Sequence, residues 1–367
     1  MTMPATDLRQ PSRPLRILEI GGGIFREIVP QQTDFYWVDR KKRAGERLLG
    51  PVNLWRVVLK LWKGEYDLVA VNAPLMSPWH PRSLLTAIRE WHVQAPAAIF
   101  ATIAVRYLHW LHRTPIAALD FQDTFGIRAH NLSLIDRCTA YFKRELPADK
   151  WQVFFRSAHW DLPGKRWRSK RSSQARLAKL MPISISTGAT TEPISAPKTT
   201  DVFFAGDVFP NSSIRTEGLG ELLALRDEGI VVDWPERRIT HAEFTQRLAG
   251  AWLSWSPSGY GWDCYRHHES GLLGTVAVIN YPTIRRHAPL EHGEHCYYYA
   301  PEPGGLSAAI RAALADKAKL ERMATAARQH VLDHHTALAR VEYVARTVTG
   351  RNLDGSPAEL QGKGQAG

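Results

Sequence analysis

Cysteine is scarce in this sequence, and its scarcity excludes two kinds of protein. The 367 residues include three cysteines, Cys138, Cys264 and Cys296, which are widely spaced and odd in number. They provide neither a disulfide framework nor a CxxC metal site. We therefore expect a reducing, cytoplasmic setting.

Long apolar runs are also missing. No stretch reaches the roughly 18 apolar residues that a membrane span needs, and the segment from Met1 to Arg16 is polar and proline-containing. We expect no signal peptide and no span. Hydrophobic residues make up 44% of the chain and charged residues 23%, which is a globular composition that excludes a disordered regulator.

Negative charge is in the minority. The 47 Lys and Arg residues exceed the 36 Asp and Glu residues, which gives a net charge of +11. This balance indicates an anionic partner, and because no zinc-ligand spacing or basic zipper is present, we expect no nucleic acid. The stretch from Trp55 to Trp62 interleaves Arg56 and Lys60 with apolar residues, which suits peripheral contact with an anionic surface such as the inner membrane face. An ordinary half-buried helix has the same pattern.

Strand and helix patterns alternate over the first 150 residues. The run from Leu15 to Ile20 is apolar and stops at Gly21, Gly22 and Gly23, as a buried parallel strand does. Further strands are predicted over 35–38, 68–71, 97–101 and 116–119, with helices over 51–63 and 83–93. This alternation predicts a doubly wound parallel sheet.

A second series of the same kind follows the polar segment 183–200. Strands are predicted over 202–205, 251–256 and 275–280, and helices over 306–315, 317–332 and 336–349. Thr240 and Glu243 form a capping box that begins another helix. Asp263 is the expected cap of a helix that ends at Gly274. The last helix carries a stripe of apolar residues, namely Leu338, Val341, Val344, Ala345 and Val348.

The stretch from Ser256 to Asn280, SPSGYGWDCYRHHESGLLGTVAVIN, predicts a strand end, a glycine-containing loop, a helix and a strand. Glycine in the loop 258–261 lets backbone approach a ligand closely, and the helix N-terminus behind it suits a phosphate. Arg266 and Glu269 lie three residues apart and so on one helical face. The same spacing is also found in ordinary ion pairs on the surface of a helix. A guanidinium can bind a diphosphate in two-pronged fashion, and a carboxylate can accept two hydrogen bonds from a ribose diol.

This stretch resembles the donor-binding signature of glycosyltransferases with the GT-B fold, particularly the group-1-like and exostosin-like branches. The matching residues are Gly259, Gly261, Arg266, Glu269, Gly274 and 276–279. Upstream, FFAGD with its Gly206 and the segment from Asn211 to Arg215 are similar to the first strand and phosphate-side loop of the same nucleotide domain. The resemblance covers residues 201–335.

The resemblance implies an α/β architecture of two Rossmann-like domains facing a cleft, with a C-terminal helix that crosses back to the first domain. It implies a hexosyltransferase with a UDP- or GDP-sugar donor, a glycan, lipid-linked or small-molecule acceptor, and no cofactor or obligatory metal. The expected divisions are a disordered N-terminus over 1–14, an acceptor-side domain over 15–182, a donor domain over 183–335, a crossover helix over 336–350 and a disordered tail over 351–367.

The same resemblance assigns roles in the donor site. Glu269 would bind the ribose, and Arg215 and Arg266 would stabilise the departing diphosphate. The remaining donor-binding candidates are Gly206, Ser258, Gly259, Tyr260 and Gly261, and Gly21, Gly22 and Gly23 are placed on the acceptor side. His267 and His268 are candidates to contact phosphate or sugar, or to be packed in the interior.

A general base is needed only if the reaction inverts the sugar. The candidates are Asp39, Asp120, Asp123 and His130. Asp123 is preferred because it follows a predicted parallel strand, where ligands bind in such sheets. Retaining members often carry an acidic residue eight positions before the Glu, and Gly261 stands there, so both outcomes stay open.

Two rival functions compete with this interpretation. LEIGGG, followed by a strand that ends in Asp39, also resembles the first motif of methyltransferases that bind S-adenosylmethionine, although Phe25 stands where a third glycine is expected. A catalytically silent nucleotide- or carbohydrate-binding protein with the same fold is the other alternative.

Overall fold

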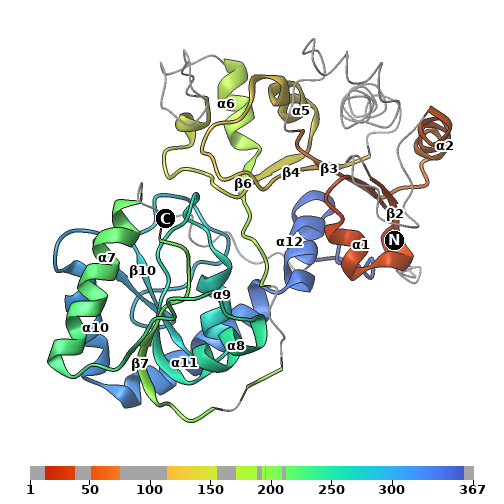
Figure 1. Ribbon diagram of the computed structural model, residues 1–367. Coiled ribbons are helices and arrows are strands. Elements are labelled where there is room, and N and C mark those ends of the chain that lie inside the picture. Colours follow the sequence, from red (N-terminus) through yellow and green to blue (C-terminus); the bar gives the residue numbers. More distant parts are fainter. Residues whose placement is uncertain are drawn as a thin grey trace, which may run out of the picture.

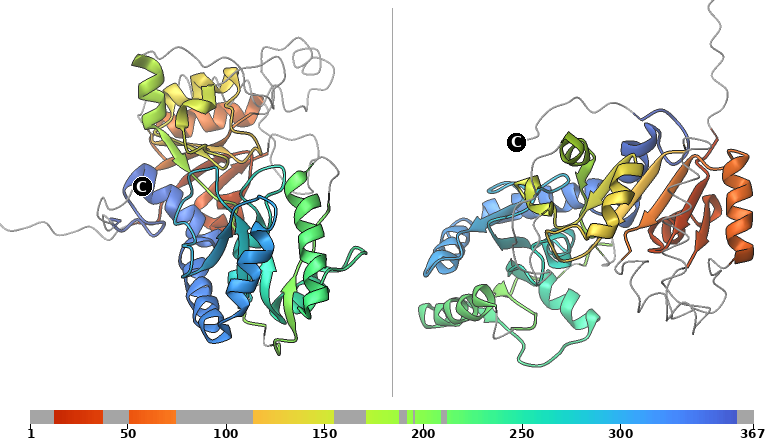
Figure 2. Two further views of the ribbon diagram at one scale, coloured as in Figure 1. Left: turned by 90° about the vertical axis from the view of Figure 1, so that its left-hand side faces the viewer. Right: turned by 90° about the horizontal axis from the view of Figure 1, so that it is seen from above.

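The chain folds into two α/β domains, each built on one parallel sheet (Figures 1 and 2). This computed structural model describes residues 13–37, 51–74, 114–154, 171–187, 192–194, 196–208 and 212–358. The predicted strand over 97–101, the predicted helix over 83–93 and Asp39 lie outside those ranges. The prediction of two Rossmann-like domains is confirmed.

The first sheet has the order β2-β1-β3-β4-β5-β6, with every neighbouring pair parallel. Its strands are β1 Ile17–Ile20, β2 Thr33–Tyr36, β3 Leu68–Asn72, β4 Ile116–Asp120, β5 Ala140–Lys143 and β6 Leu180–Pro182. Its helices are α1 Ile24–Ile28, α2 Pro51–Trp62, α5 Leu132–Arg137 and α6 Arg171–Ala178. Because β1, β4 and β5 are buried along their whole lengths, both faces of the sheet are covered.

The second sheet has the order β11-β10-β9-β7-β8 and is also parallel. Its strands are β7 Thr200–Phe203, β8 Val232–Asp233, β9 Ala251–Trp255, β10 Val276–Asn280 and β11 Cys296–Tyr299. Its helices are α7 Ser213–Ala224, α8 His241–Ala249, α9 Tyr265–Leu272, α10 Gly305–Leu314 and α11 Lys317–His334. The capping box is present, because the Thr240 hydroxyl accepts the Glu243 backbone N–H at 3.2 Å.

The last helix, α12 Ala337–Thr349, crosses back to the first domain, as predicted (Figure 1). Val341 and Val344 join Ile17 in the core on one face of the first sheet. Leu338 does not belong to this stripe, because its side chain is 50% exposed. The helix therefore ties the end of the chain to its beginning.

The tail differs from its prediction. Residues 351–358 fold back on the first domain: Leu353 is buried in its core, and the Leu15 N–H donates to the Leu353 carbonyl at 3.0 Å. Arg351 adds two further bonds, since its guanidinium donates to Asp67 and to the Arg13 carbonyl, both at 3.2 Å. Composition alone does not reveal these contacts. Residues 1–12 and 359–367 lie outside the described ranges, and the domain boundaries at 182 and 335 stay predictions.

The two domains touch directly beyond the end of β5. The Ala148 N–H donates to the Thr283 carbonyl at 3.1 Å, and the Arg285 N–H donates to the Leu146 carbonyl at 2.7 Å. Pro147 and Ile284 form an antiparallel bridge between these bonds. The segment after β5 is thus bonded through its backbone to residues 283–285 of the second domain.

Candidate functional site

The strand order of each sheet locates the position where a ligand is expected. Numbered along the chain, the second sheet runs 2-1-3-4-5, so its connections reverse direction between β7 and β9. Ligands of doubly wound sheets bind at this switch point, outside the carboxyl ends of the strands. Gly206 follows β7, and the loop 258–261 follows β9. In the first sheet the corresponding position, between β1 and β3, carries the turn 21–23.

Arg215 ties the two loops of the second switch point together. It comes from the first turn of α7 and is 5% exposed. Its Nε donates to the Ser258 carbonyl at 2.9 Å, and its Nη1 donates to the Asp207 carbonyl at 2.7 Å. Burial and the neighbouring Arg266 cation both lower the pKa of Arg215. Arg215 therefore holds the site together while placing positive charge in it.

Arg266 stands beside Arg215 but has few partners. It projects from the first turn of α9, and its Nη1 lies 3.4 Å from the Ala205 carbonyl. Its Nε and Nη2 are buried and have no hydrogen-bond partner among the described residues. A guanidinium with buried, unused donors is suited to an anionic ligand, because leaving such donors unpaired costs free energy.

Glu269 lies one turn after Arg266 on α9. Its carboxylate is partly buried, and within the described part of the chain it accepts no hydrogen bond. Burial raises its pKa, an effect that the positive charges of Arg266 and His241 oppose. The helix thus presents a cation and an unengaged carboxylate at the same end of the sheet, as its sequence predicts.

The glycines of the site make room for charged side chains. A Cβ on Gly206 would lie 3.2 Å from Arg266 Nη1, and one on Gly259 would lie 3.1 Å from Arg215 Nη2. A Cβ on Gly261 would overlap the carboxylate of Glu145, which comes from the first domain. The sequence explains these glycines by the close approach of a ligand. The structure adds a second reason, because a Cβ at these positions would crowd charged side chains of the protein.

Glu145, from the first domain, supports the loop 256–264 between β9 and α9, which is called the donor-side loop because the sequence predicts donor binding there. It accepts the backbone N–H groups of Trp262 at 2.9 Å and Asp263 at 3.0 Å. The expectation that Asp263 caps α9 is wrong: Cys264 is the N-cap, and the buried Asp263 carboxylate accepts the Ile185 N–H at 2.8 Å. Sequence analysis missed Glu145, because no local pattern relates it to a loop more than a hundred residues away.

Asp123 lies at the same contact between the two domains, which is called the junction. Its carboxylate pairs with Arg144, whose guanidinium also donates to the Asp263 carbonyl. The other described candidates for a base are engaged elsewhere. Asp120 is buried and accepts from the Tyr141 hydroxyl at 2.8 Å, and His130 Nε2 lies 2.9 Å from the Pro74 carbonyl. Among these three candidates Asp123 is the most accessible, with its side chain 45% exposed.

Arg340 was not found by sequence analysis. It projects from α12, and its guanidinium carbon lies 5.5 Å from the centre of the Phe121 ring. Its Nε is buried, and the guanidinium has no hydrogen bond or ion pair among the described residues. Burial lowers its pKa, while Tyr265 of the second domain and Glu27 of the first act in the opposite direction. It therefore stands where the domains meet.

The glycine turn of the first domain is closed by its own carboxylate. Gly21, Gly22 and Gly23 have φ values of +72°, +82° and +84°, which favour glycine. Glu19 Oε2 accepts the Arg26 N–H at 3.0 Å, at the start of α1, and burial raises the pKa of Glu19 to about 7. Because Glu19 occupies this helix end, the end is not left open for a phosphate.

His267 and His268 are packed in the interior. His267 Nε2 lies 3.1 Å from the Ser256 carbonyl, and its ring lies 4.7 Å from that of Trp262. His268 stacks on His335 with the ring centres 4.0 Å apart. Among the described residues no group of His, Cys, Asp and Glu is arranged to hold a metal ion, and no helix is long and apolar enough to cross a membrane.

Comparison with known proteins identifies the fold. No family model matches the sequence, and no curated protein matches it significantly. The structure is similar to HepE of Anabaena in complex with UDP-glucose, with a TM-score of 0.51 and 12% identity over 91% of this chain and 99% of that one. It is also similar to a glycosyltransferase of Rickettsia africae, with a TM-score of 0.50 and 9% identity over 90% and 98% of the two chains. The predicted GT-B architecture is thereby confirmed.

Proposed function

We propose that this protein is a glycosyltransferase whose nucleotide-sugar donor binds at the switch point between β7 and β9. The observation that carries the proposal is that buried donors of Arg266 and the carboxylate of Glu269 lie one helical turn apart and have no hydrogen-bond partners among the described residues. A diphosphate and a ribose diol have the complementary chemistry. The UDP-glucose complex of HepE supports a nucleotide-sugar donor of this kind.

The chemistry follows from where charge develops. As the glycosidic bond to the donor breaks, the leaving nucleoside diphosphate gains negative charge. Arg266 and Arg215 then bind it more strongly than they bind the intact donor, which lowers the barrier. Two guanidiniums supply the positive charge that a metal ion otherwise provides, so we propose metal-independent transfer.

The acceptor is proposed to lie against the first domain, across the junction from the arginines. Its candidate base is Asp123, and the turn 21–23 belongs to the same side of the junction. Because Arg144 pairs with Asp123 and also contacts the donor-side loop, a proton acceptor at this position is coupled to the donor site. We also propose that the transferred sugar is a hexose. The protein is further proposed to belong to the group-1-like or exostosin-like branch of these enzymes.

Calorimetry with nucleotides tests the donor site. UDP or GDP should bind without added metal, and Glu269→Ala should weaken binding by about tenfold, the loss of about 1.4 kcal/mol expected for a charged hydrogen bond to a ribose. Glu321→Ala, which removes an exposed carboxylate on α11, is the matched control and should leave binding unchanged. Equal affinity in wild type and Glu269→Ala would remove Glu269 from the site.

The same titration with S-adenosylhomocysteine separates the rival enzyme class. We expect no binding, because Glu19 already occupies the helix end behind the glycine turn. Tight binding that survives Glu269→Ala and is lost in Asp39→Ala would overturn the glycosyltransferase proposal. Nucleotide binding without transfer or hydrolysis of any donor sugar would identify a silent binding protein instead.

A further inference from the structure

Helix α2 buries one side and leaves an apolar strip on the other. Val57 and Leu61 are buried in the core of the first domain. Trp55 and Trp62, seven residues apart and so on one face of the helix, are 63% and 58% exposed. Large apolar side chains exposed as a pair mark an interaction surface more often than isolated ones do.

Cations border this strip on one side. At 100° per residue, Lys63 and Arg56 follow the tryptophans round the helix, and Lys60 comes next, before the buried face. Lys63 and Arg56 are exposed and form no ion pair within the part of the chain that the structure describes. The helix therefore carries tryptophan beside free positive charge, the pattern of helices that lie at a membrane interface.

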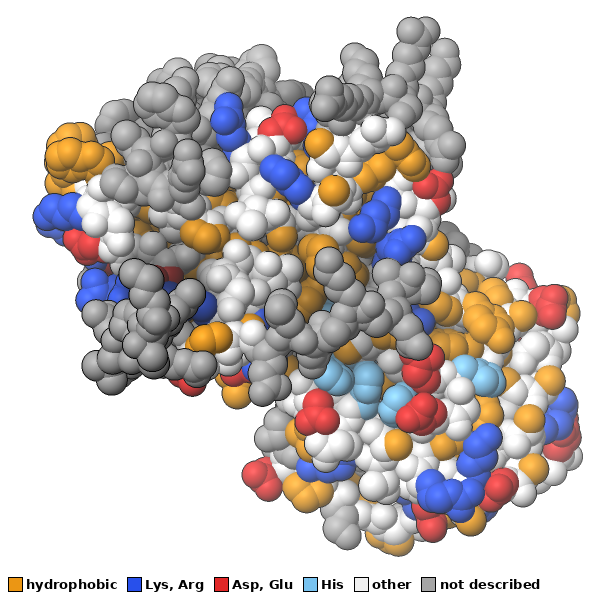
Figure 3. Space-filling model, turned by 180° about the vertical axis from the view of Figure 1, so that it is seen from behind, with side chains coloured by type: hydrophobic (Ala, Val, Ile, Leu, Met, Phe, Trp, Pro, Cys, Tyr) orange, Lys and Arg blue, Asp and Glu red, His pale blue; other side chains and the backbone are white. Residues whose placement is uncertain are grey.

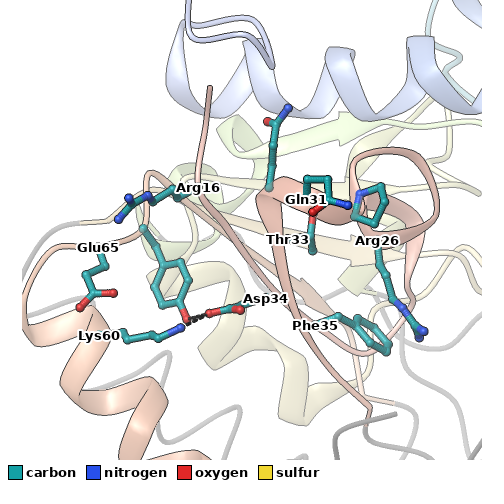
Figure 4. Close-up of a pocket in the computed structure, with 11 residues that line it drawn as sticks. Arg16, Arg26, Gln31, Thr33, Asp34, Phe35, Lys60 and Glu65 are labelled. Atoms are coloured by element: carbon teal, nitrogen blue, oxygen red, sulfur yellow. Dashed lines mark hydrogen bonds and ion pairs between the residues drawn. The ribbon is translucent and has the colours of Figure 1, made fainter. Parts of the chain in front are cut away.

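A pocket of about 490 Å³ extends this basic border toward the edge of the sheet (Figure 4). Lys60 reaches into it from α2 and pairs with Asp34 of β2 at 2.5 Å. Arg16 and Arg26 line the pocket beyond that pair, with Glu65 as the other carboxylate. Cations outnumber carboxylates there by three to two, so the positive surface continues past the helix.

We propose that α2 docks this protein on an anionic lipid bilayer, with Trp55 and Trp62 at headgroup depth and Arg56 and Lys63 against lipid phosphates. Tryptophan favours this depth because its ring is apolar and its N–H needs a polar partner. The net charge of +11 adds long-range attraction to a negative surface. A bilayer is the occupant that fits best, because tryptophans beside cations on one exposed helix face match the pattern of helices at a membrane interface. This inference is independent of the proposed donor site.

Sedimentation with vesicles tests it. The full chain should bind vesicles of phosphatidylcholine containing about one third phosphatidylglycerol, and it should bind less as salt is added. Trp55→Ser with Trp62→Ser, and separately Arg56→Gln with Lys63→Gln, should each weaken binding by about tenfold or more. Arg238→Gln with Arg322→Gln makes the same change of charge on exposed residues of the second domain and should have little effect.

Three results would overturn the proposal. They are no binding to the anionic vesicles, equal binding to phosphatidylcholine alone, and full binding by both α2 variants. Sedimentation velocity covers the remaining alternative, because a wild-type dimer that the tryptophan variant dissociates would show that the strip joins two copies of this chain. Thermal midpoints and nucleotide affinity of the α2 variants should match wild type, which separates this test from that of the donor site.

Discussion

At the scale of single residues, the two arginines of the proposed donor site differ in what surrounds them. Arg215 donates to two backbone carbonyls, whereas Arg266 keeps buried donors without partners among the described residues. Both would attract a diphosphate. Only Arg215 also holds the two loops in place, so the two residues should respond differently to removal.

Replacing each arginine by leucine separates these roles. Arg266→Leu should leave the thermal midpoint near that of wild type and lower kcat by about a hundredfold, the usual loss when one transition-state contact is removed. Arg215→Leu should lower kcat and also reduce stability by about 1–3 kcal/mol, because Ser258 and Asp207 lose their donor. Melting curves and steady-state kinetics check this. A rise in KM at unchanged kcat in Arg266→Leu would show uniform binding instead.

Arg340 supports a second prediction at this scale. The Arg340 guanidinium lies over Phe121 and has no acceptor among the described residues, so it should bind an anionic or hydroxyl-bearing part of a substrate between the domains. Arg340→Leu should therefore raise the KM for the acceptor by about tenfold while stability stays equal or increases, since a largely buried cation with no ion pair in the described part of the chain is costly. Arg340→Lys should recover part of the affinity. Loss of stability in Arg340→Leu would show that the side chain is structural.

At the scale of elements, the loop between β9 and α9 depends on a glycine that faces the first domain. Gly261→Ala would push a methyl group into the Glu145 carboxylate, which accepts the next two backbone N–H groups. We expect a loss of stability of about 1–3 kcal/mol, as for other overpacked sites, together with weaker nucleotide binding. Gly220→Ala is the control, because its added methyl meets nothing within 4 Å and a helical alanine is favourable. Denaturant unfolding compares the two, and equal stabilities would contradict this role for Gly261.

Local pattern predicted most of the elements and little of the contact between them. The run TVAVIN predicts β10 because it is continuously apolar, and the Thr240 capping box marks the start of α8. Local rules favour Asp263 as the cap of α9 because Asp is a preferred N-cap residue, whereas the observed N-cap is its neighbour Cys264. Glu145 and Arg340 could not be found at all, since each acts on residues of the other domain and leaves no mark in its own neighbourhood.

At the scale of the whole molecule, histidines gather where the two domains and α12 meet (Figure 3). His268 stacks on His335, and both His330 and His335 donate from Nε2 to the Ala288 carbonyl, at 2.9 and 2.8 Å. The Thr187 N–H of the linker donates to the His335 carbonyl at 3.1 Å. The segment that joins the second domain to α12 therefore packs against buried histidine side chains.

This cluster should make the fold labile to acid. Burial lowers the pKa of His268 to about 3 and that of His287 to about 4, while both titrate near 6.5 when unfolded. Their contribution to stability is complete above pH 6.5 and is lost as the pH falls toward those values. His268 alone should cost about 2 kcal/mol at pH 5. Burial raises the pKa values of Glu19 and Asp263 to about 7 and also raises those of Glu145 and Glu269, so these four carboxyls act in the opposite direction.

Urea unfolding at pH 7.5 and pH 5 measures the effect. His268→Gln should narrow the difference in unfolding free energy between the two pH values by about 2 kcal/mol, whatever it costs at neutral pH. His241→Gln, which changes an exposed histidine of α8, should leave the difference unchanged. A difference between the two pH values that is the same in His268→Gln as in wild type would contradict the prediction.

The contact between Glu145 and the donor-side loop affects how the domains of such a protein can be exchanged to make chimeras. A chimera that takes residues 183–335 from this chain and the first domain from another keeps Gly261 but loses the carboxylate that fills the space beside it. The backbone N–H groups of Trp262 and Asp263 then lose the carboxylate that accepts them. The unit of exchange is therefore the second domain together with the segment from Arg144 to Ala148. Grafts that move this pair as one should keep their donor preference, and grafts cut at the linker should lose it.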